Sequence, residues 1–267
     1  MTANMEAAKS PLDREELRDV IDLALWAGQM LLQNGADAER VEETVQSIGT
    51  ELGAEGVDAL VSPNALIVTT SSGAEFRTKV RRIISMGVNM TVVEQISHLN
   101  HRVAEGKMDR FVVRSELTRI SDMPHEFNRW QIVITVGLAC AAFSRLFGGD
   151  LPVIVITFLA AAIAMYVRQL LTRHNFNALL IVIATAFVSG LIASSASILH
   201  LSDHAQTALV ASVLLLVPGV HLINSIQDII KGHIVIGLVR GFTGLVISLC
   251  IALGLLLAMQ LAGVSGI

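Results

Sequence analysis

The distribution of charged side chains constrains this chain more than any other feature of its sequence. Only eight of its 42 Asp, Glu, Lys and Arg residues lie after Trp130. They leave three long stretches without such a residue, at 174–202, 205–227 and 241–267. A bilayer core is about 30 Å thick, and a helix needs roughly 20 apolar residues to cross it. The sequence therefore predicts an α-helical polytopic membrane protein with a soluble N-terminal part.

Five transmembrane helices fit the apolar half of the chain. The chain would then consist of a cytoplasmic α+β domain, residues 1–124, and a transmembrane domain, residues 125–267. Short polar connections separate the predicted helices. The predicted spans cover residues 131–147, 151–170, 176–199, 205–223 and 235–262.

The positions of Lys and Arg predict the orientation of these spans. Connections that carry Lys and Arg tend to lie in the cytoplasm. If the N-terminal domain lies inside, the two outer connections, 148–150 and 200–204, carry neither residue, and only Arg145 lies near an outer end. The N-terminus shows no charged-then-apolar signal pattern, so we expect the first domain to stay in the cytoplasm. The cytoplasmic connections would carry Arg168, Arg173, Lys231 and Arg240.

The soluble half shows helical spacing first, then strand patterns, then helical spacing again. Asn34-Gly35 supplies a stop for the first helix, and Asp37 supplies an N-cap for the second. Ser71-Ser72-Gly73 is predicted to be the loop of a β-hairpin. The predicted helices cover 14–33, 37–52, 90–105 and 109–120, and the predicted strands cover 57–61, 65–70 and 74–80.

Composition excludes several classes of function. Residues 1–130 have a net charge of −6, which argues against a nucleic-acid partner because phosphate contacts need clustered Lys and Arg. No glycine-rich phosphate loop, nucleophile elbow or paired-cysteine motif is present, so we expect no enzyme and no cofactor. His98 and His101 lie one helical turn apart beside two glutamates. Without further ligands, a solvated helix face is favoured over a metal site.

Charged residues inside or beside the predicted spans are the first candidates for function, because a charge in a bilayer is costly unless it faces protein or water. Arg145 lies about one turn from the loop that ends in Asp150. It either extends to the outer headgroups or lines an anion path, with Asp150 as its partner. Arg168 ends the second span, and we expect its side chain to extend to the inner surface.

Residues 212–233 form the most informative segment. Pro218 removes a backbone donor and Gly219 loosens the helix, so the fourth span should kink or unwind there. Asn224, Asp228 and Lys231 follow at spacings of four and three, which puts them on one helical face. A broken helix with a polar face is typical of transporters. The alternative is a kinked helix that leaves the membrane with an ordinary solvated tail.

These residues resemble the threonine/serine exporter family. The resemblance rests on 211–219 (Ala-Ser-Val-Leu-Leu-Leu-Val-Pro-Gly) with Asn224, Asp228 and 231–233 (Lys-Gly-His). It extends to 164–171, to the Arg145…Asp150 stretch, to Gly28…Gly35-Ala36 and to 62–66 (Ser-Pro-Asn-Ala-Leu). Val220-His221 departs from the Phe-Pro pair expected after Pro-Gly. The chain is similar to the larger, five-span subunit of the split form of this family.

The resemblance implies a two-component secondary exporter. Its substrate would be a succinate-type dicarboxylate or another small carboxylate, and its partner would be a smaller, separately encoded membrane subunit; a higher oligomer is left open. Alternatives are a threonine/serine exporter subunit and a membrane sensor or scaffold that does not transport. Pro218 and Gly219 would open the fourth helix, and Asn224 and Asp228 would contact substrate or a coupling proton. Arg145 would attract the substrate carboxylate, with Lys231 or Arg168 as a second cation.

Overall fold

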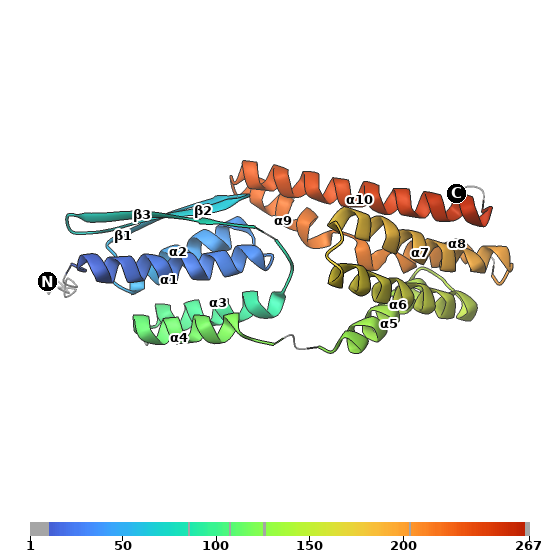
Figure 1. Ribbon diagram of the computed structural model, residues 1–267, viewed down its shortest axis with the longest axis horizontal. Helices are drawn as coiled ribbons and strands as arrows, with labels where there is room; N and C mark the ends of the chain where they lie inside the picture. The colour runs from blue at the N-terminus through green and yellow to red at the C-terminus, as the bar shows by residue number, and fades with distance from the viewer. Residues whose placement is uncertain (1–10, 85, 107, 125–126, 203, 265–267) are drawn as a thin grey trace, which may run out of the picture. The chain divides into compact units, whose positions relative to one another are not determined.

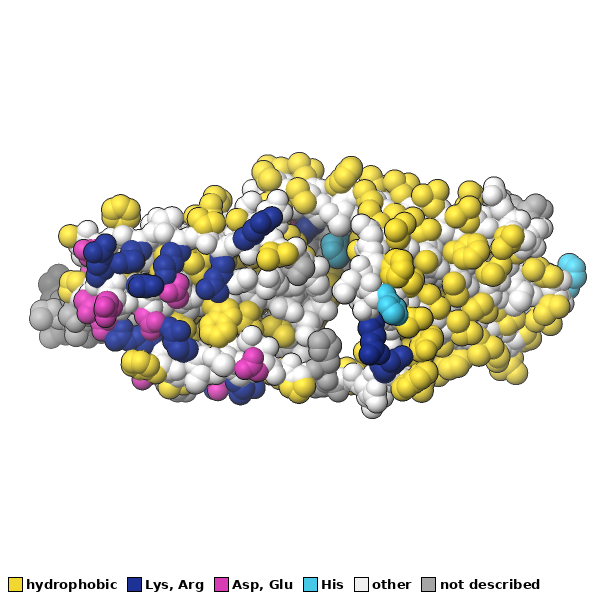
Figure 2. Space-filling view, in the orientation of Figure 1, with side chains coloured by type: hydrophobic (Ala, Val, Ile, Leu, Met, Phe, Trp, Pro, Cys, Tyr) yellow, Lys and Arg dark blue, Asp and Glu magenta, His cyan; other side chains and the backbone are white. Residues whose placement is uncertain are grey.

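The computed structural model divides the chain into two compact units. The first unit comprises residues 1–124 and 220–241, and the second comprises 125–219 and 242–267. The structure describes all residues except 1–10, 85, 107, 125–126, 203 and 265–267. The units differ from the predicted ranges 1–124 and 125–267 in one segment, because 220–241 packs with the N-terminal elements. On the face drawn in Figure 2, charged side chains gather over the N-terminal elements, and hydrophobic side chains cover the second unit.

Helix α1 (Arg14–Gln33) is the centre of the first unit. Its N-cap, Asp13, forms a capping box with Glu16, which satisfies two backbone N–H groups at the helix start. A Cβ atom at Gly28 would lie 2.5 Å from a methyl group of Val45, so glycine lets α2 (Ala38–Glu51) approach closely. Apolar residues of α1 are buried on most sides: Leu17, Val20, Ile21, Leu23, Ala24, Leu25, Ala27, Leu31 and Leu32.

A three-stranded antiparallel sheet packs on α1 and α2 (Figure 1). Its strands are β1 (Gly56–Ser62), β2 (Ala65–Ser72) and β3 (Glu75–Arg82), in that order across the sheet. Three strands were predicted, and the helical and strand ranges agree to within a few residues. The predicted hairpin loop at 71–73 was wrong by two residues. Ser71 and Ser72 belong to β2 and pair with Phe76 and Glu75, which leaves Gly73 and Ala74 as the turn.

Helices α3 (Met90–Ala104) and α4 (Arg110–Ser121) complete the N-terminal part of this unit. Glu116 accepts hydrogen bonds from Arg119 and Arg102, which lower the pKa of its carboxyl group. Helix α9 (Gly219–Ile230) and the first turns of α10 (Ile234–Ala262) also belong to this unit, apart from Gly219 itself. Ile236 of α10 is 1% exposed and is part of the same hydrophobic core as α1.

The second unit consists of apolar helices. Small residues let them pack closely: a Cβ atom at Gly190 would lie 2.8 Å from Leu255 and 3.0 Å from Ala258. Its elements are α5 (Arg129–Leu146), α6 (Leu151–Arg173), α7 (Ala178–Ile198), α8 (Ala205–Ser212), the 3₁₀ turn η1 (Leu214–Leu216) and the remainder of α10.

The described helices support three to four membrane spans rather than a firm five. Helices α6, α7 and α10 are long and apolar enough to cross a bilayer, and α8–η1 with α9 forms a bent pair that counts as a fourth span if it is continuous. Helix α5 does not meet the same test, although it covers the predicted first span. The sequence of α5 includes Arg129, Gln131 and Arg145, which reduce its apolar character.

Candidate functional site

The polar face of α9 lies against the turn that joins α1 to α2. The side-chain amide of Asn224 donates a hydrogen bond to the carbonyl oxygen of Gly35, at 2.8 Å. The carboxylate of Asp228 accepts a hydrogen bond from the backbone N–H of Ala38, also at 2.8 Å. Gly35 has a φ of +96°, a conformation that glycine adopts without strain. Asn224 and Asp228 therefore share one face, as predicted, and that face contacts the α1–α2 turn of the first unit.

Asp228 and Arg240 form a buried ion pair at this contact. An Arg240 Nη1 lies 2.6 Å from Asp228 Oδ2, and the exposed fractions of the two side chains are 5% and 0%. Nη2 of Arg240 donates a further hydrogen bond to the carbonyl oxygen of Ala36, at 2.8 Å. Both carboxylate oxygens of Asp228 are thus engaged, one by Ala38 and one by Arg240. Each buried charge stabilises the other, because an unpaired charge in a site that excludes water costs several kcal/mol of folding free energy.

Lys231 extends the contact toward solvent. It forms ion pairs with Glu39 and, at 3.5 Å, with Asp37, which is the N-cap residue of α2. The hydrogen bond to Glu39 raises the pKa of the Lys231 ammonium group. His233 lies 3.6 Å from a carboxylate oxygen of Glu42. Lys231 therefore lies on the predicted face, but its ammonium group is already paired with the acidic side chains at the start of α2.

Glycines allow α10 to pack against α9. A Cβ atom at Gly237 would lie 2.9 Å from the carbonyl oxygen of Ser225, and one at Gly241 would lie 2.7 Å from the Ser225 hydroxyl. That hydroxyl donates to the carbonyl of Gly237 at 2.7 Å. Gly237 and Gly241, which are four residues apart, therefore form a packing motif on α10. Close packing brings Arg240 to Asp228.

The opposite face of α9 is apolar and exposed. Ile223 is 58% exposed, Ile226 is 60% exposed and Ile230 is 79% exposed. A helix on a water-soluble domain normally turns its apolar face inward. Here the polar face is held by protein and the apolar face points outward, which is the arrangement expected of a helix that borders lipid.

The break between α8 and α9 is stabilised by polar side chains of neighbouring helices. Helix α8 ends at Ser212, η1 follows, and a new helix begins at Gly219 after the buried Pro218. Ser189 of α7 donates to the carbonyl of Ser212 at 3.1 Å. Arg168 of α6 donates to the carbonyl of Leu215 at 3.4 Å. The predicted interruption at Pro218 and Gly219 is therefore confirmed, with its free carbonyls satisfied by side chains.

The structure bears on one expected contact and on one of the alternatives left open for Arg145. We expected Arg168 to extend to the inner surface, but its half-buried side chain donates to a free carbonyl of the interrupted helix instead. Arg145 donates to the carbonyl of Gly149 at 3.3 Å, and within the described residues it forms no ion pair with Asp150. Asp150 is the N-cap residue of α6, and its buried Oδ1 atom has no hydrogen-bond partner among the described residues.

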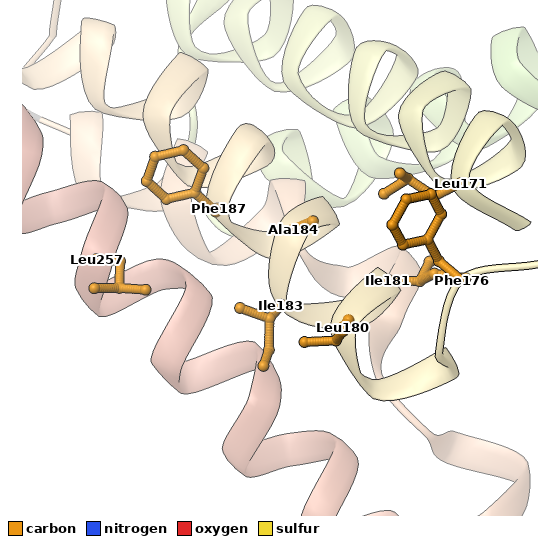
Figure 3. Close-up of a pocket in the computed structure, with 8 residues that line it drawn as sticks. All are labelled: Leu171, Phe176, Leu180, Ile181, Ile183, Ala184, Phe187 and Leu257. Atoms are coloured by element: carbon orange, nitrogen blue, oxygen red, sulfur yellow. The ribbon is translucent and has the colours of Figure 1, made fainter. Parts of the chain in front are cut away.

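Two pockets in the described part of the chain lie in different units. One, of about 450 Å³, is lined only by apolar residues of the second unit (Figure 3): Leu171, Phe176, Leu180, Ile181, Ile183, Ala184, Phe187 and Leu257. It offers a carboxylate no polar contact. The other, of about 20 Å³, has room for roughly one water. Its lining includes His221, Asn224 and Arg240.

The histidines considered for a metal are exposed on α3. His98 and His101 each lie 3.7 Å from a glutamate on the same helix face or at its end, Glu94 and Glu105 respectively. Within the described residues, no three His, Cys, Asp or Glu side chains are grouped closely enough to hold a metal ion.

Arg240 is the residue that the sequence reasoning missed. It was assigned to a cytoplasmic connection, although the predicted fifth span, 235–262, contains it. A charge within an apolar helix is itself a signal of function or of a buried partner. That signal would have identified Arg240, but not the partner, since twelve residues and a turn separate it from Asp228 in the sequence.

Comparisons with known proteins find one family and several relatives. Residues 22–262 match the family model described as "Putative threonine/serine exporter" (ThrE). The chain is 37% identical to the probable succinate transporter subunit YjjP of Klebsiella aerogenes, over 95% of this chain and 98% of that protein. It is 34% identical to the protein of the same name from Escherichia coli K12, over 96% and 99%.

A more distant relative has a different length. The chain is 23% identical to the probable threonine/serine exporter of Mycobacterium tuberculosis, over 93% of this chain but only 47% of that protein. No solved structure matches. The family match covers most of the chain, and the similarity to the two transporter subunits is nearly full-length. This membrane protein therefore belongs to the threonine/serine exporter family.

Proposed function

We propose that this chain is one subunit of a two-component secondary exporter that moves a succinate-type dicarboxylate out of the bacterial cytoplasm. The observation that carries the proposal is the nearly full-length similarity to two relatives named as succinate transporter subunits. The sequence has no nucleotide-binding motif, so an ion gradient is the energy source that fits. The N-terminal domain would lie in the cytoplasm and the apolar helices in the inner membrane.

The lengths of the relatives support a second membrane subunit. This chain aligns with about half of the Mycobacterium tuberculosis exporter, at 47% of its length. The remaining half of such a protein would correspond to the smaller subunit. The two pockets described above also support a partner: one lacks polar groups and the other is too small for a dicarboxylate. The route for substrate would form where the two subunits meet.

The role of α9 in this exporter would be to link the soluble domain to the interrupted helix. Asn224 and Asp228 hold α9 to the α1–α2 turn, so a change in that turn would move α9. Asp228 would then act as an anchor, because both of its carboxylate oxygens are engaged. Arg145 and Arg168 remain the proposed contacts for the substrate carboxylates, since no acidic side chain in the described chain pairs with either.

The test is transport by purified protein in proteoliposomes. Vesicles that contain this chain and its smaller subunit, preloaded with unlabelled succinate, should take up labelled succinate by counterflow. Vesicles with either subunit alone should not. Labelled threonine and serine, tested in parallel, identify the alternative substrate. An absence of flux for all three, with both subunits folded, would favour a sensor or scaffold and refute the proposal.

Arg168→Gln is expected to lower succinate efflux about tenfold or more, because hydrogen bonds to a charged group are worth about 1.5–3 kcal/mol. The measurement is the initial rate of labelled efflux from vesicles with equal amounts of folded protein. Arg168→Lys is the matched control. If charge attraction is sufficient, the lysine variant should recover part of the rate; if Leu215 and substrate both need the planar guanidinium, it should not. Wild-type efflux by Arg168→Gln would remove this residue from the mechanism.

A further inference from the structure

Within the described residues of the first unit, no helix of that unit covers one face of its sheet. Helices α1 and α2 pack against the other face (Figure 1). Residues of β2 alternate accordingly: Leu66, Val68, Thr70 and Ser72 are buried, whereas the residues between them are partly exposed. On β3, Lys79 binds Asp22 of α1, which places it on the helix side. The outer face is therefore formed by the other half of the strand residues, which alternate along each strand with those on the helix side.

Apolar side chains form the centre of this outer face. Strand pairing sets Ile67 of β2 opposite Leu60 of β1 on one side and opposite Val80 of β3 on the other. Leu60 is 60% exposed and Val80 is 64% exposed. Phe76, on the same face of β3, is 73% exposed. Clustered exposed apolar residues on a soluble domain usually mark a contact surface.

Two opposite charges flank this apolar centre. Asp58 of β1 is opposite Thr69, and Arg82 of β3 is opposite Ala65, so Ile67 lies midway between the two charges. From strand spacing and rise, each charged Cα lies roughly 8 Å from that of Ile67, in opposite directions. They are the only charged residues of the strands on this face, and within the described chain neither has an ion-pair partner.

We propose that this face pairs with the same face of a second copy of the chain. A two-fold axis near Ile67 would place Asp58 of each copy against Arg82 of the other. Two equivalent ion pairs would then form across the interface. Such self-complementarity is what an isologous interface requires. The apolar row of Leu60, Ile67 and Val80 would be buried between sheets about 10 Å apart.

A lipid surface fits this face less well. Anionic headgroups attract clusters of Lys and Arg, and the outer face carries one base and one acid. The basic side chains of β3 that the sequence clusters at 77–82 alternate between faces, and Lys79 and Arg81 contact α1 through Asp22 and Gln29. The inference concerns the soluble domain alone and does not depend on which substrate is transported.

The first test uses Ile67→Cys in the full-length chain, expressed with its smaller subunit in native membranes. A residue close to a two-fold axis should be joined to its own copy by a short bifunctional thiol cross-linker, because sheets about 10 Å apart hold the two cysteines too far apart for a direct disulfide. Wild-type chain sets the background, since Cys140 and Cys250 are buried. Ser115→Cys, on the exposed side of α4, is the control for random collision. A strong dimer band for Ile67→Cys alone is expected; equal bands for both would overturn the proposal.

The second test exchanges the charges and keeps the proposal testable if the cysteine variant does not fold. Asp58→Arg and Arg82→Asp, each alone, should lower self-association in tagged pull-downs by about tenfold, because like charges would face each other at both corners. Co-expression of the two variants with different tags should restore association, since each chain then presents the charges that the other lacks. The restoration also shows that both variants fold.

The alternatives give different results. If the face binds the smaller subunit or lipid, single exchanges would leave self-association at wild-type level, and mixing the two variants would restore nothing. Cross-linking of Ile67→Cys to the smaller subunit only, or its labelling by a lipid-phase probe only, would likewise overturn the proposal.

Discussion

Asp228→Ala is expected to destabilise the first unit by about 3–5 kcal/mol, because it leaves the buried guanidinium of Arg240 without its counter-charge. It also removes the acceptor for the N–H of Ala38 at the start of α2. The measurement is denaturant unfolding in detergent, followed by tryptophan fluorescence. The chain has two tryptophans, Trp26 on α1 and Trp130 on α5. In a Trp130→Phe background, Trp26 reports the first unit alone.

Three controls make this result specific to the ion pair. Asp228→Asn keeps an acceptor for Ala38 but loses the charge, so it should lie between wild type and Asp228→Ala. The double variant Asp228→Leu with Arg240→Leu should recover much of the loss, since apolar residues replace buried ion pairs at little cost. Lys231→Ala, which removes an exposed ion pair, should change the midpoint little. An unchanged midpoint for Asp228→Ala would show that the pair contributes nothing.

Gly254→Val is expected to disrupt the second unit. A Cβ atom at this position of α10 would lie 2.5 Å from the carbonyl oxygen of Ile183 and 2.7 Å from the Cβ atom of Ala186, both on α7. Backbone atoms cannot move aside as a flexible side chain can, so α10 and α7 must separate. Overpacking of this kind typically costs 1–3 kcal/mol and occasionally more. The proteoliposome flux described above should fall with it, because close helix packing holds the apolar helices together.

The matched control for Gly254→Val is Ala252→Val, two residues earlier on the exposed side of the same helix. It adds similar volume and the same β-branched side chain, but no neighbouring backbone opposes it. Trp130, in a Trp26→Phe background, reports unfolding of the second unit. Equal unfolding midpoints for the two variants would show that α10 does not pack closely against α7 at Gly254.

Local features of the sequence predicted the local structure well. Capping residues and helical spacing identified α1 to α4, and β-rich runs identified three strands, because these signals act between residues a few positions apart. Pro218 and Gly219 predicted the interrupted helix for the same reason. Asn224, Asp228 and Lys231 were placed on one face by their spacing, and the structure confirms that they contact a common region.

The partners of those residues were not predictable. Asn224 binds Gly35 and Asp228 binds Ala38, at sequence separations of 189 and 190 residues. The spacing within α9 says which side chains share a face but not what the face meets. Arg240 was therefore assigned to a solvated connection, and five spans were predicted from apolar length alone.

The charge distribution by itself determined that the second half is apolar enough for a membrane and that the first half is not, since side-chain polarity sets the solvent that each segment prefers. Capping residues, Pro218 and Gly219 in the sequence indicated where helices begin, end and break. Only the tertiary structure decided that α9 turns its polar face to the α1–α2 turn and its isoleucines outward. That choice depends on burying Asp228 and Arg240 together, and a buried charge is tolerated only where the fold brings its counter-charge within hydrogen-bonding distance.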